Sequence, residues 1–378
     1  MDERHRVLHV TTTGRVGGAE RLIADLAVAA QSGNLHAVAV AILSEPGDLG
    51  AELGRSGIPC YSFPIRGMRD VPSVVLSLSR LMIREAFTAV HGHLVHGAFI
   101  GLVAARLARV PLRVMTIHYD RYIWRYGPPL PRLLHILSRR LADHVFAVSH
   151  AAQEALVRAE GLARSKVTVV HNGIDAERVR RSVHFGIPLV GRAIVTVGSL
   201  EPWKGHRFLI EAFAQLRSTD GLPLVLIGDG HLRGRLADLA RSLGVGGTVN
   251  FAGYRPNPYG LMNAAEFYVQ PSLDEGFGLA VLESMALGKA VIATRVGGLP
   301  DIISDSAHGI LVPPGDPMAL RAAMESLLAD HALRNELGTA GRTRVETAFS
   351  ATAAARRYAD EYDRLARTGA ARPSRGRN

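Results

Sequence analysis

The segment from Phe267 to Gly288 most constrains the fold of this chain, because a strand, a glycine turn and a helix follow one another within it. Residues 267–270 form a β-like stretch. A turn that contains Gly276 and Gly278 comes next, and apolar residues from Leu279 onward then recur at helical spacing. A strand that turns directly into a helix is the repeating unit of a parallel sheet with crossover helices. The segment therefore predicts an α/β fold.

Strand-like and helix-like stretches alternate along the rest of the chain as well. The expected strands are residues 7–10, 37–43, 89–90, 113–117, 145–148, 167–170, 193–197, 224–227, 249–251 and 290–293. The expected helices are residues 19–31, 72–84, 97–109, 130–142, 151–160, 208–216, 232–243, 279–287, 317–329, 332–340 and 351–367. An apolar content of 47% excludes a disordered chain, and 378 residues suffice for two domains with separate cores.

Two glutamates, Glu275 and Glu283, flank the turn and the start of the helix in the opening segment. The amides of Phe277, Gly278 and Leu279 would lie at the N-terminus of this helix, where an anion binds well. Carboxylates accept hydrogen bonds from hydroxyls, and eight residues of helix span about 12 Å, the scale of a sugar, a diphosphate and a ribose. The pattern predicts a clamp for a sugar nucleotide. The alternative is an ordinary amphipathic helix with two solvated glutamates.

This string resembles the E-x7-E motif of glycosyltransferase family 4, retaining enzymes with two facing Rossmann-like domains, an arrangement called the GT-B fold. Further segments, between Val7 and about Leu365, resemble other motifs of the family in the same order. They are Gly14-Arg-Val-Gly17-Gly18-Ala-Glu20, Thr116-Ile-His118, Asn172-Gly-Ile-Asp175, Gly198-Ser-Leu-Glu-Pro-Trp-Lys204-Gly205, Leu226-Ile-Gly228-Asp-Gly230 and Thr294-Arg-Val-Gly297-Gly298-Leu-Pro300-Asp301. The resemblance implies an α/β protein with two facing Rossmann-like domains and an interdomain cleft.

The resemblance also implies the limits of the domains. We expect an N-terminal, acceptor-side domain at residues 1–180 and a C-terminal, nucleotide-sugar-binding domain at residues 192–350. The arginine-, glycine- and proline-containing stretch before the second domain gives a linker at residues 181–191. Residues 351–367 are expected to form a helix that can cross back to the N-terminal domain. The polar, basic residues 368–378 are expected to be a disordered tail.

The activity that the resemblance implies is a retaining transfer of a sugar, of the hexosyltransferase type, from a nucleoside diphosphate sugar to an acceptor hydroxyl, in glycolipid or cell-surface polysaccharide synthesis. The implied catalytic residues are His118 near the anomeric carbon, Glu275 and Lys204. The implied donor-binding residues are Gly17, Gly18, Gly198, Ser199, Lys204, Tyr254, Glu275, Gly276, Phe277, Gly278, Leu279 and Glu283. The family often has an arginine at the position of Ser199, where it would pair with the diphosphate, so this departure places more weight on Lys204.

No metal or other cofactor is expected, because no Asp-x-Asp motif lies near these segments. His91, His93 and His96 are close in sequence, but no cysteine or carboxylate cluster nearby supports a zinc site. We expect these three histidines to be strand-end and loop residues that line the acceptor cleft.

Three other functions fit parts of the sequence. A sugar-nucleotide epimerase of related fold is one, and an inactive sugar-nucleotide-binding scaffold, suggested by Ser199, is another. A dehydrogenase fits less well, because the glycines from Gly228 to Gly234 have a spacing that differs from the dinucleotide-binding fingerprint.

Positive charge is concentrated in residues 55–140, which hold thirteen arginines against three acids. This excess of ten equals the formal charge of the whole chain, +10. Such a region attracts a phosphorylated acceptor or an anionic membrane. The alternative is compositional bias, since only three of the 44 basic residues are lysines. The acceptor-side candidates are Tyr119, Trp124, Arg125, Arg66, Arg69 and Arg106, and the predicted partner is an anionic or lipid-linked acceptor rather than nucleic acid.

The predicted location is the cytoplasm, with peripheral attachment to the inner face of the cytoplasmic membrane as a further possibility. The N-terminal residues lack the apolar core of a signal peptide. The uncharged stretches 26–44 and 86–105 contain too many polar residues and glycines to span a bilayer. Cys60 is the single cysteine, so no intramolecular disulfide forms. The cysteine count therefore does not distinguish a reducing from an oxidising compartment.

Overall fold

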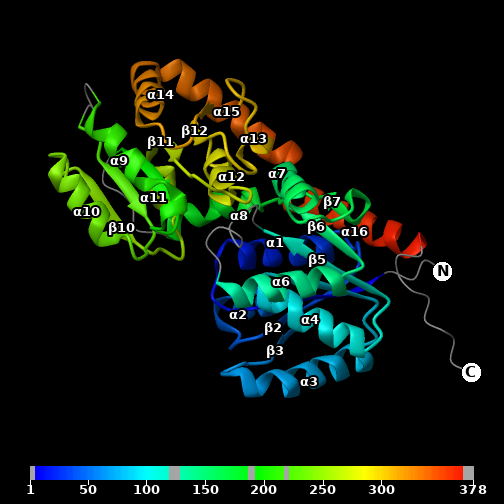
Figure 1. The fold of residues 1–378 in the computed structure, drawn as a ribbon. Coiled ribbons are helices and arrows are strands. Elements are labelled where there is room, and N and C mark those ends of the chain that lie inside the picture. Colours follow the sequence, from blue (N-terminus) through cyan, green and yellow to red (C-terminus); the bar gives the residue numbers. More distant parts are fainter. Residues whose placement is uncertain (1–4, 119–127, 186–191, 217–220, 369–378) are drawn as a thin grey trace, which may run out of the picture. The chain divides into compact units, whose positions relative to one another are not determined.

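Two parallel β-sheets organise the chain in the computed structural model, which describes residues 5–118, 128–185, 192–216 and 221–368 (Figure 1). The sheets belong to two units of the chain. The first unit consists of residues 1–173 together with residues 351–378, and the second unit of residues 174–350. Within the described residues, no helix combines the length and apolar character that a membrane crossing requires.

The sheet of the first unit has seven parallel strands in the described residues, in the order β3-β2-β1-β4-β5-β6-β7. These strands are β1 (Arg6–Thr11), β2 (Ala37–Ile42), β3 (Cys60–Ser62), β4 (Ala89–His93), β5 (Leu112–Ile117), β6 (His144–Ala147) and β7 (Val167–Val169). Strand β2 reads Ala-Val-Ala-Val-Ala-Ile, and its last five residues are buried. Continuous apolar strands of this kind are expected in a sheet that helices cover on both faces.

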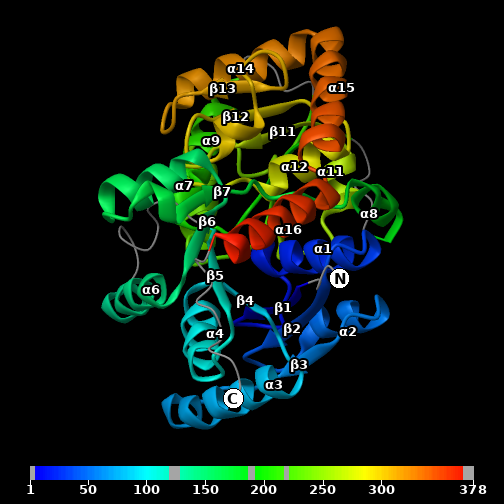
Figure 2. The same ribbon diagram turned by 90° about the vertical axis from the view of Figure 1, so that its right-hand side faces the viewer.

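The helices of the first unit are α1 (Gly18–Ser32), α2 (Gly47–Arg55), α3 (Val71–Arg84), α4 (Val95–Leu107), α6 (Pro129–Leu141), α7 (His150–Glu154) and α16 (Ala351–Arg367). Short helical turns are η1 (Met68–Asp70), η2 (Ala155–Ala159) and η3 (Arg164–Lys166). Helix α16 comes from the far end of the sequence and lies alongside α1, as Figure 2 shows. Its residues Tyr358, Tyr362 and Leu365 are buried.

The sheet of the second unit has six parallel strands in the described residues, in the order β10-β9-β8-β11-β12-β13. They are β8 (Ala193–Val197), β9 (Leu224–Ile227), β10 (Val249–Gly253), β11 (Ala265–Gln270), β12 (Val291–Thr294) and β13 (Ile310–Val312). The helices are α8 (Ala176–Arg181), η4 (Ser182–Phe185), η5 (Pro202–Lys204), α9 (His206–Ala214), α10 (Arg233–Ser242), α11 (Tyr259–Asn263), α12 (Leu279–Ala286), α13 (Leu299–Ile302), α14 (Pro317–Ala329) and α15 (His331–Ala348).

Both sheets reverse their strand order at one place, between β1 and β4 in the first unit and between β8 and β11 in the second. Ligands of open α/β sheets bind beyond the carboxyl ends of the strands at such a switch point. Each unit therefore offers one edge of its sheet at which a site is expected. The predicted α/β class with two Rossmann-like sheets is confirmed.

The structure differs from the predicted limits in two respects. The second unit begins at residue 174, so residues 174–180 do not belong to the first. Helix α8 packs against α12 in the second unit, and the ion pair between Arg180 and Glu346, with 2.7 Å between nitrogen and oxygen, joins it to α15. Residues 181–185, predicted as linker, continue as helix in α8 and η4, and residues 186–191 lie outside the described part of the chain.

Candidate functional site

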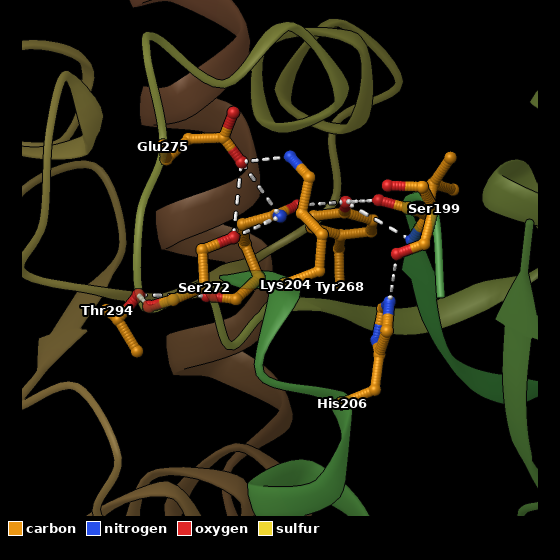
Figure 3. A network of polar contacts seen from close by, with 9 residues as sticks. Ser199, Lys204, His206, Tyr268, Ser272, Glu275 and Thr294 are labelled. Carbon is orange, nitrogen blue, oxygen red and sulfur yellow. Dashed lines mark hydrogen bonds and ion pairs between the residues drawn. The ribbon is translucent and has the colours of Figure 1, made fainter. Parts of the chain in front are cut away.

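The Glu275 carboxylate lies beyond the carboxyl end of β11, at the switch point of the second sheet. One of its oxygens, Oε2, accepts hydrogen bonds from the Lys204 ammonium (2.6 Å), the Ser272 hydroxyl (3.1 Å) and the Gln270 amide (3.2 Å), as Figure 3 shows. The side chains of Lys204 and Glu275 keep 19% and 12% of their surface exposed. The other oxygen, Oε1, takes part in none of these bonds. One side of the carboxylate is thus anchored to protein, and the other can bind a ligand.

A second layer of buried polar groups fixes the residues that hold Glu275. The Tyr268 hydroxyl donates to Gln270 Oε1 at 2.5 Å, and the Gln270 amide nitrogen donates to Ser272 Oγ at 2.8 Å. The Thr294 hydroxyl on β12 donates to the Ser272 carbonyl at 2.6 Å. Burial raises the pKa of Tyr268 above its usual range, which keeps the hydroxyl protonated as a donor. Side chains from β11 and β12 therefore orient this carboxylate before any ligand binds.

The turn after β8 carries Gly198 and Ser199 to the same edge of the sheet. A Cβ at Gly198 would lie 3.6 Å from the Lys204 side chain and 3.8 Å from the His206 ring, so the turn passes close to both. The ring nitrogen Nε2 of His206 donates to the Ser199 carbonyl at 3.2 Å. Burial, and to a lesser degree the Lys204 charge, lowers the pKa of His206 to about 4. His206 is therefore neutral at pH 7, and Ser199 itself is exposed.

The loop that follows Glu275 is closely packed against a neighbouring turn. Gly297 has φ +53°, and a Cβ there would meet the Glu275 carbonyl at 1.6 Å. Gly278 has φ 109° and ends the loop where α12 begins. The first hydrogen bonds within α12 are donated by Val281 and Leu282, so the amides of the preceding residues point out of the helix N-terminus. This end of α12 suits a phosphate, as predicted for the amides of Phe277, Gly278 and Leu279.

Glu283 lies on α12, and its Oε1 accepts a hydrogen bond from the Tyr259 hydroxyl at 2.9 Å. The Arg178 guanidinium donates to the same hydroxyl at 3.2 Å and lies 5.7 Å from the centre of the Tyr259 ring. Burial and the nearby Glu283 charge raise the pKa of Tyr259 above its usual range. The Tyr259 hydroxyl, which α11 holds in place, therefore orients the Glu283 carboxylate. Tyr254, also expected at this site, is 43% exposed after β10.

Glu275, Glu283 and Lys204 were predicted from the sequence, whereas the residues that hydrogen-bond to them were not. Gln270, Ser272, Tyr268, Tyr259 and Arg178 form no motif. One signal was present: Gln270 ends a strand and Ser272 follows it immediately before the glycine turn, where side chains reach the edge of the sheet.

Predicted residues of the first unit lie at the carboxyl edge of its own sheet. Gly17 follows β1 and Gly18 begins α1, and a Cβ at Gly17 would lie 2.9 Å from the buried Glu20 carboxylate. His118 directly follows β5. It is partly exposed, its Nε2 lies 3.2 Å from His93 Nδ1, and desolvation lowers its pKa to about 4. His118 is therefore neutral and held by a second histidine.

The acceptor-side candidates do not form one group. Arg66 lies before η1 and Arg69 within it, and both are exposed; η1 precedes α3. Arg106 lines a pocket of about 490 Å³ with Arg113, Asp143 and other residues at the amino ends of β5 and β6, the edge opposite to His118. Tyr119, Trp124 and Arg125 lie outside the described residues.

The expectation that His91, His93 and His96 line the acceptor cleft is wrong in part. His91 and His93 are strand residues of β4 with no exposed surface, so they do not line an open cleft. The rings of Tyr358 and Tyr362 on α16 contact His91, and His93 lies against the rings of His9, His91 and His118. His96 is exposed on α4.

Comparisons with known proteins agree with this architecture. Residues 16–178 match the family described as Glycosyltransferase Family 4, and residues 183–344 match the family described as Glycosyl transferases group 1. The chain is 30% identical over 315 residues to the D-inositol 3-phosphate glycosyltransferase of Corynebacterium kroppenstedtii, which covers 76% of this chain and 69% of that protein.

A second similar protein comes from Campylobacter jejuni. The N-acetylgalactosamine-N,N'-diacetylbacillosaminyl-diphospho-undecaprenol 4-alpha-N-acetylgalactosaminyltransferase of Campylobacter jejuni is 32% identical over 206 residues. This match covers 54% of the chain and 56% of the relative, so the chain spans little more than half of that protein.

Among solved structures, HepE of Anabaena in complex with UDP and glucose superposes with a TM-score of 0.81 at 22% identity. That superposition covers 96% of this chain and 100% of the other, so the two share their fold. Together with the matches in sequence, it shows that the chain belongs to the glycosyltransferases of the family 4 type and has their GT-B fold.

Proposed function

We propose that the protein transfers a sugar from a nucleoside diphosphate sugar to an acceptor hydroxyl, with retention of configuration at the anomeric carbon. The observation that carries this proposal is the half-anchored carboxylate of Glu275, ion-paired with Lys204 at the switch point of the second sheet. A carboxylate oxygen that protein donors leave aside can accept hydrogen bonds from sugar hydroxyls. A lysine and a helix N-terminus beside it can neutralise a diphosphate.

The roles of the residues follow from these chemistries. Glu275 holds hydroxyls of the donor sugar through Oε1, and Glu283 holds those of the ribose. Lys204 and the amides at the start of α12 stabilise the charge that develops on the leaving diphosphate. Lys204 and the amides take the role that the resemblance to glycosyltransferase family 4 gives to an arginine at the position of Ser199.

Retention is assigned to a front-face substitution. A retaining glycosidase uses two carboxylates about 5 Å apart, one of them as the nucleophile. Among the described residues, the hydrogen-bonding neighbour of His118 is a histidine, not a carboxylate. In the proposed reaction the departing phosphate oxygen accepts the proton of the acceptor hydroxyl. A neutral His118 donates or accepts a hydrogen bond at the transferred sugar.

A panel of nucleotide sugars tests this assignment, with UDP-glucose first because HepE was solved with UDP and glucose. We expect slow donor hydrolysis without acceptor and a retained linkage, read by proton NMR, when an acceptor is present. An isomeric sugar nucleotide would instead indicate an epimerase, and binding without turnover would indicate a scaffold. Activity should persist in a chelator, because lysine and amides carry the charge; a strict magnesium requirement would contradict the proposed site.

For the acceptor, we propose an anionic or lipid-linked molecule reached from the inner membrane surface. Met68 on η1 is 77% exposed, and Leu76 and Ile83 on α3 are 53% and 60% exposed. Exposed Arg80 lies between the last two at helical spacing, so apolar and basic side chains share one face of α3. Arg66 and Arg69 adjoin it. A helix face of this composition suits the interface of an anionic bilayer.

Sedimentation with vesicles of phosphatidylglycerol and phosphatidylcholine tests the membrane proposal. We expect binding that weakens with salt and falls at least several-fold in Leu76→Ser with Ile83→Ser. Leu243→Ser, which removes an exposed leucine from the second unit, is the matched control. No binding at low salt, together with good activity on a neutral soluble acceptor, would contradict the membrane proposal. The proposed transferase activity would not be affected by that result.

A further inference from the structure

Three buried histidines, His9, His91 and His93, lie on two neighbouring strands of the first unit's sheet. His9 on β1 is in register with His91 on β4, and Thr116 on β5 is in register with His93 on β4. Partners in register point to the same face of a sheet, and so do residues two apart in one strand. His91 and His93 have no exposed surface, and His9 retains 3%. Buried polar groups at this density need hydrogen-bond partners, or they cost stability.

Two hydrogen bonds link His9 and His93 to His118 in one chain of hydrogen bonds. His9 Nδ1 lies 2.9 Å from His93 Nε2, and His93 Nδ1 lies 3.2 Å from His118 Nε2. The central ring, His93, therefore uses both of its nitrogens on other imidazoles. The rings of His9 and His93 stack with centroids 5.1 Å apart, and those of His93 and His118 are 5.4 Å apart.

A neutral imidazole has one N–H donor and one bare acceptor nitrogen, so the chain can have only two directions. In one direction His93 donates to His9 and accepts from His118, whose Nδ1 is then bare. In the other, His93 donates to His118, whose Nδ1 then carries the hydrogen. Burial lowers the pKa of each of the three rings, which favours the neutral forms that such a chain needs. Moving the hydrogen from one nitrogen to the other on one ring therefore requires the same move on all three rings.

His91 belongs to a separate set of bonds. Its Nδ1 lies 2.6 Å from the Tyr362 hydroxyl and its Nε2 lies 2.6 Å from the Thr116 hydroxyl. His9, His91 and His93 also have nitrogens within 4.8 Å of one another, as a metal site would. However, both nitrogens of His91 already have hydroxyl partners, and a metal on His93 Nε2 would replace its bond to His9. The geometry favours hydrogen bonds over a metal.

We propose that His9 and His93 are positioning residues for His118. They hold its ring in one orientation and fix which of its nitrogens carries the hydrogen, so that Nδ1 presents either a donor or a lone pair to the transferred sugar. The value of this arrangement for catalysis rests on the proposed role of His118. The chain of bonds itself does not depend on that role.

Two substitutions of His93 separate the two bonds. The amide of asparagine branches at Cγ, which also carries Nδ1 of histidine, so His93→Asn keeps a partner for His118. The amide of glutamine lies one bond further out, near the place of Nε2, so His93→Gln keeps a partner for His9 and releases His118. We expect kcat to fall at least tenfold in His93→Gln with donor KM within about twofold, and to stay within a few-fold in His93→Asn.

His144→Gln is the matched control, because His144 is buried on β6 and bonded to the Thr168 hydroxyl at 2.9 Å, outside the chain. Its kcat should remain close to that of the unsubstituted protein. Equal losses in the two His93 variants, or full activity of His93→Gln, would overturn the positioning role. If the unsubstituted protein has no transferase activity, the proposed function fails instead, and the bonds are tested separately.

The separate test is nitrogen NMR of protein with ¹⁵N-labelled histidine. At pH 7.5 His9, His93 and His118 should each show one fixed neutral tautomer. In His93→Gln, the His118 ring should exchange between its Nδ1–H and Nε2–H tautomers. Averaged tautomers or a protonated ring in the unsubstituted protein would overturn the chain. So would one equivalent of tightly bound zinc that is lost on substituting His91.

Discussion

Lys204 illustrates how one side chain can act mainly on the transition state. Its ammonium is ion-paired with Glu275, so its charge is already partly balanced when the donor diphosphate binds beside it. The net gain is largest when the diphosphate leaves and takes up negative charge. We expect Lys204→Met to lower kcat about 100- to 1000-fold and to change donor KM much less. Steady-state kinetics check this, with Lys289→Met as control; a loss confined to KM would contradict it.

Glu283 should behave in the opposite way, because hydroxyls of a ribose are bound equally before and during the reaction. We expect Glu283→Ala to raise donor KM about 10- to 100-fold, the value of hydrogen bonds to a charged group, and to lower kcat less. Tyr259→Phe removes the hydroxyl that orients Glu283 and should give a smaller rise in KM. A fall in kcat with unchanged KM in both variants would assign Glu283 to the chemistry instead.

Charged residues of the site could be predicted from the sequence, and their supports could not. Glu275 and Lys204 stand out because few residue types bind diphosphate or sugar hydroxyls, and both follow strand ends. Gln270 and Tyr268 are ordinary strand residues by composition. Their role arises only when β8 and β11 become neighbours in the sheet and bring the Tyr268 hydroxyl within 3.3 Å of the Val197 backbone.

At the scale of elements, the turn between β12 and α13 fixes the loop of Glu275. We expect Gly297→Ala to destabilise the protein by about 2 kcal/mol or more, because its backbone has positive φ and its Cβ would collide with the Glu275 carbonyl. Donor affinity should fall with it. Urea unfolding and donor titration measure both effects. Gly247→Ala, in a turn with open space, is the control, and equal stability of the two variants would contradict the argument.

Most long elements could be predicted from periodicity, but several short ones and the end of one glycine-containing helix could not. The three-residue strands β3 and β13 offer too few positions for a period to be recognised. Helix α15 was expected to end at residue 340, yet it continues to Ala348. Its Gly338 and Gly341 do not interrupt it, because they allow close contact with the Gly288 carbonyl and Met285 beside α12. A glycine that permits close packing and one that ends a helix look alike in sequence.

At the scale of the molecule, acid should destabilise the two units unequally. Burial lowers the pKa of His9 to about 3 and those of His36, His118 and His144 to about 4, all in the first unit. In the unfolded chain histidine titrates near 6.5, so these rings stabilise the fold fully above that pH. As the pH falls from 6.5 towards 4, the unfolded state takes up protons first and stability is lost.

Hydrogen exchange measured by mass spectrometry at pH 7.5, 6 and 5, after correction for intrinsic rates, resolves the units. We expect peptides of the first unit to lose protection before those of the second. His144→Gln should reduce this dependence on pH. Earlier loss in the second unit, or greater protection of the first at pH 5, would contradict the prediction.

The placement of α16 has a consequence for the order in which the protein is completed during synthesis. Tyr358 and Tyr362 supply hydroxyls to Thr116 and His91, but the ribosome makes them only after the whole second unit. Chains emerge at about 5–20 residues per second, and domains fold largely as units. While residues 174–350 emerge and can fold, the first unit therefore lacks α16. During that time Thr116 and His91 lack their tyrosine partners. Of the two units, the one whose synthesis starts earlier is therefore the one whose folding is completed later.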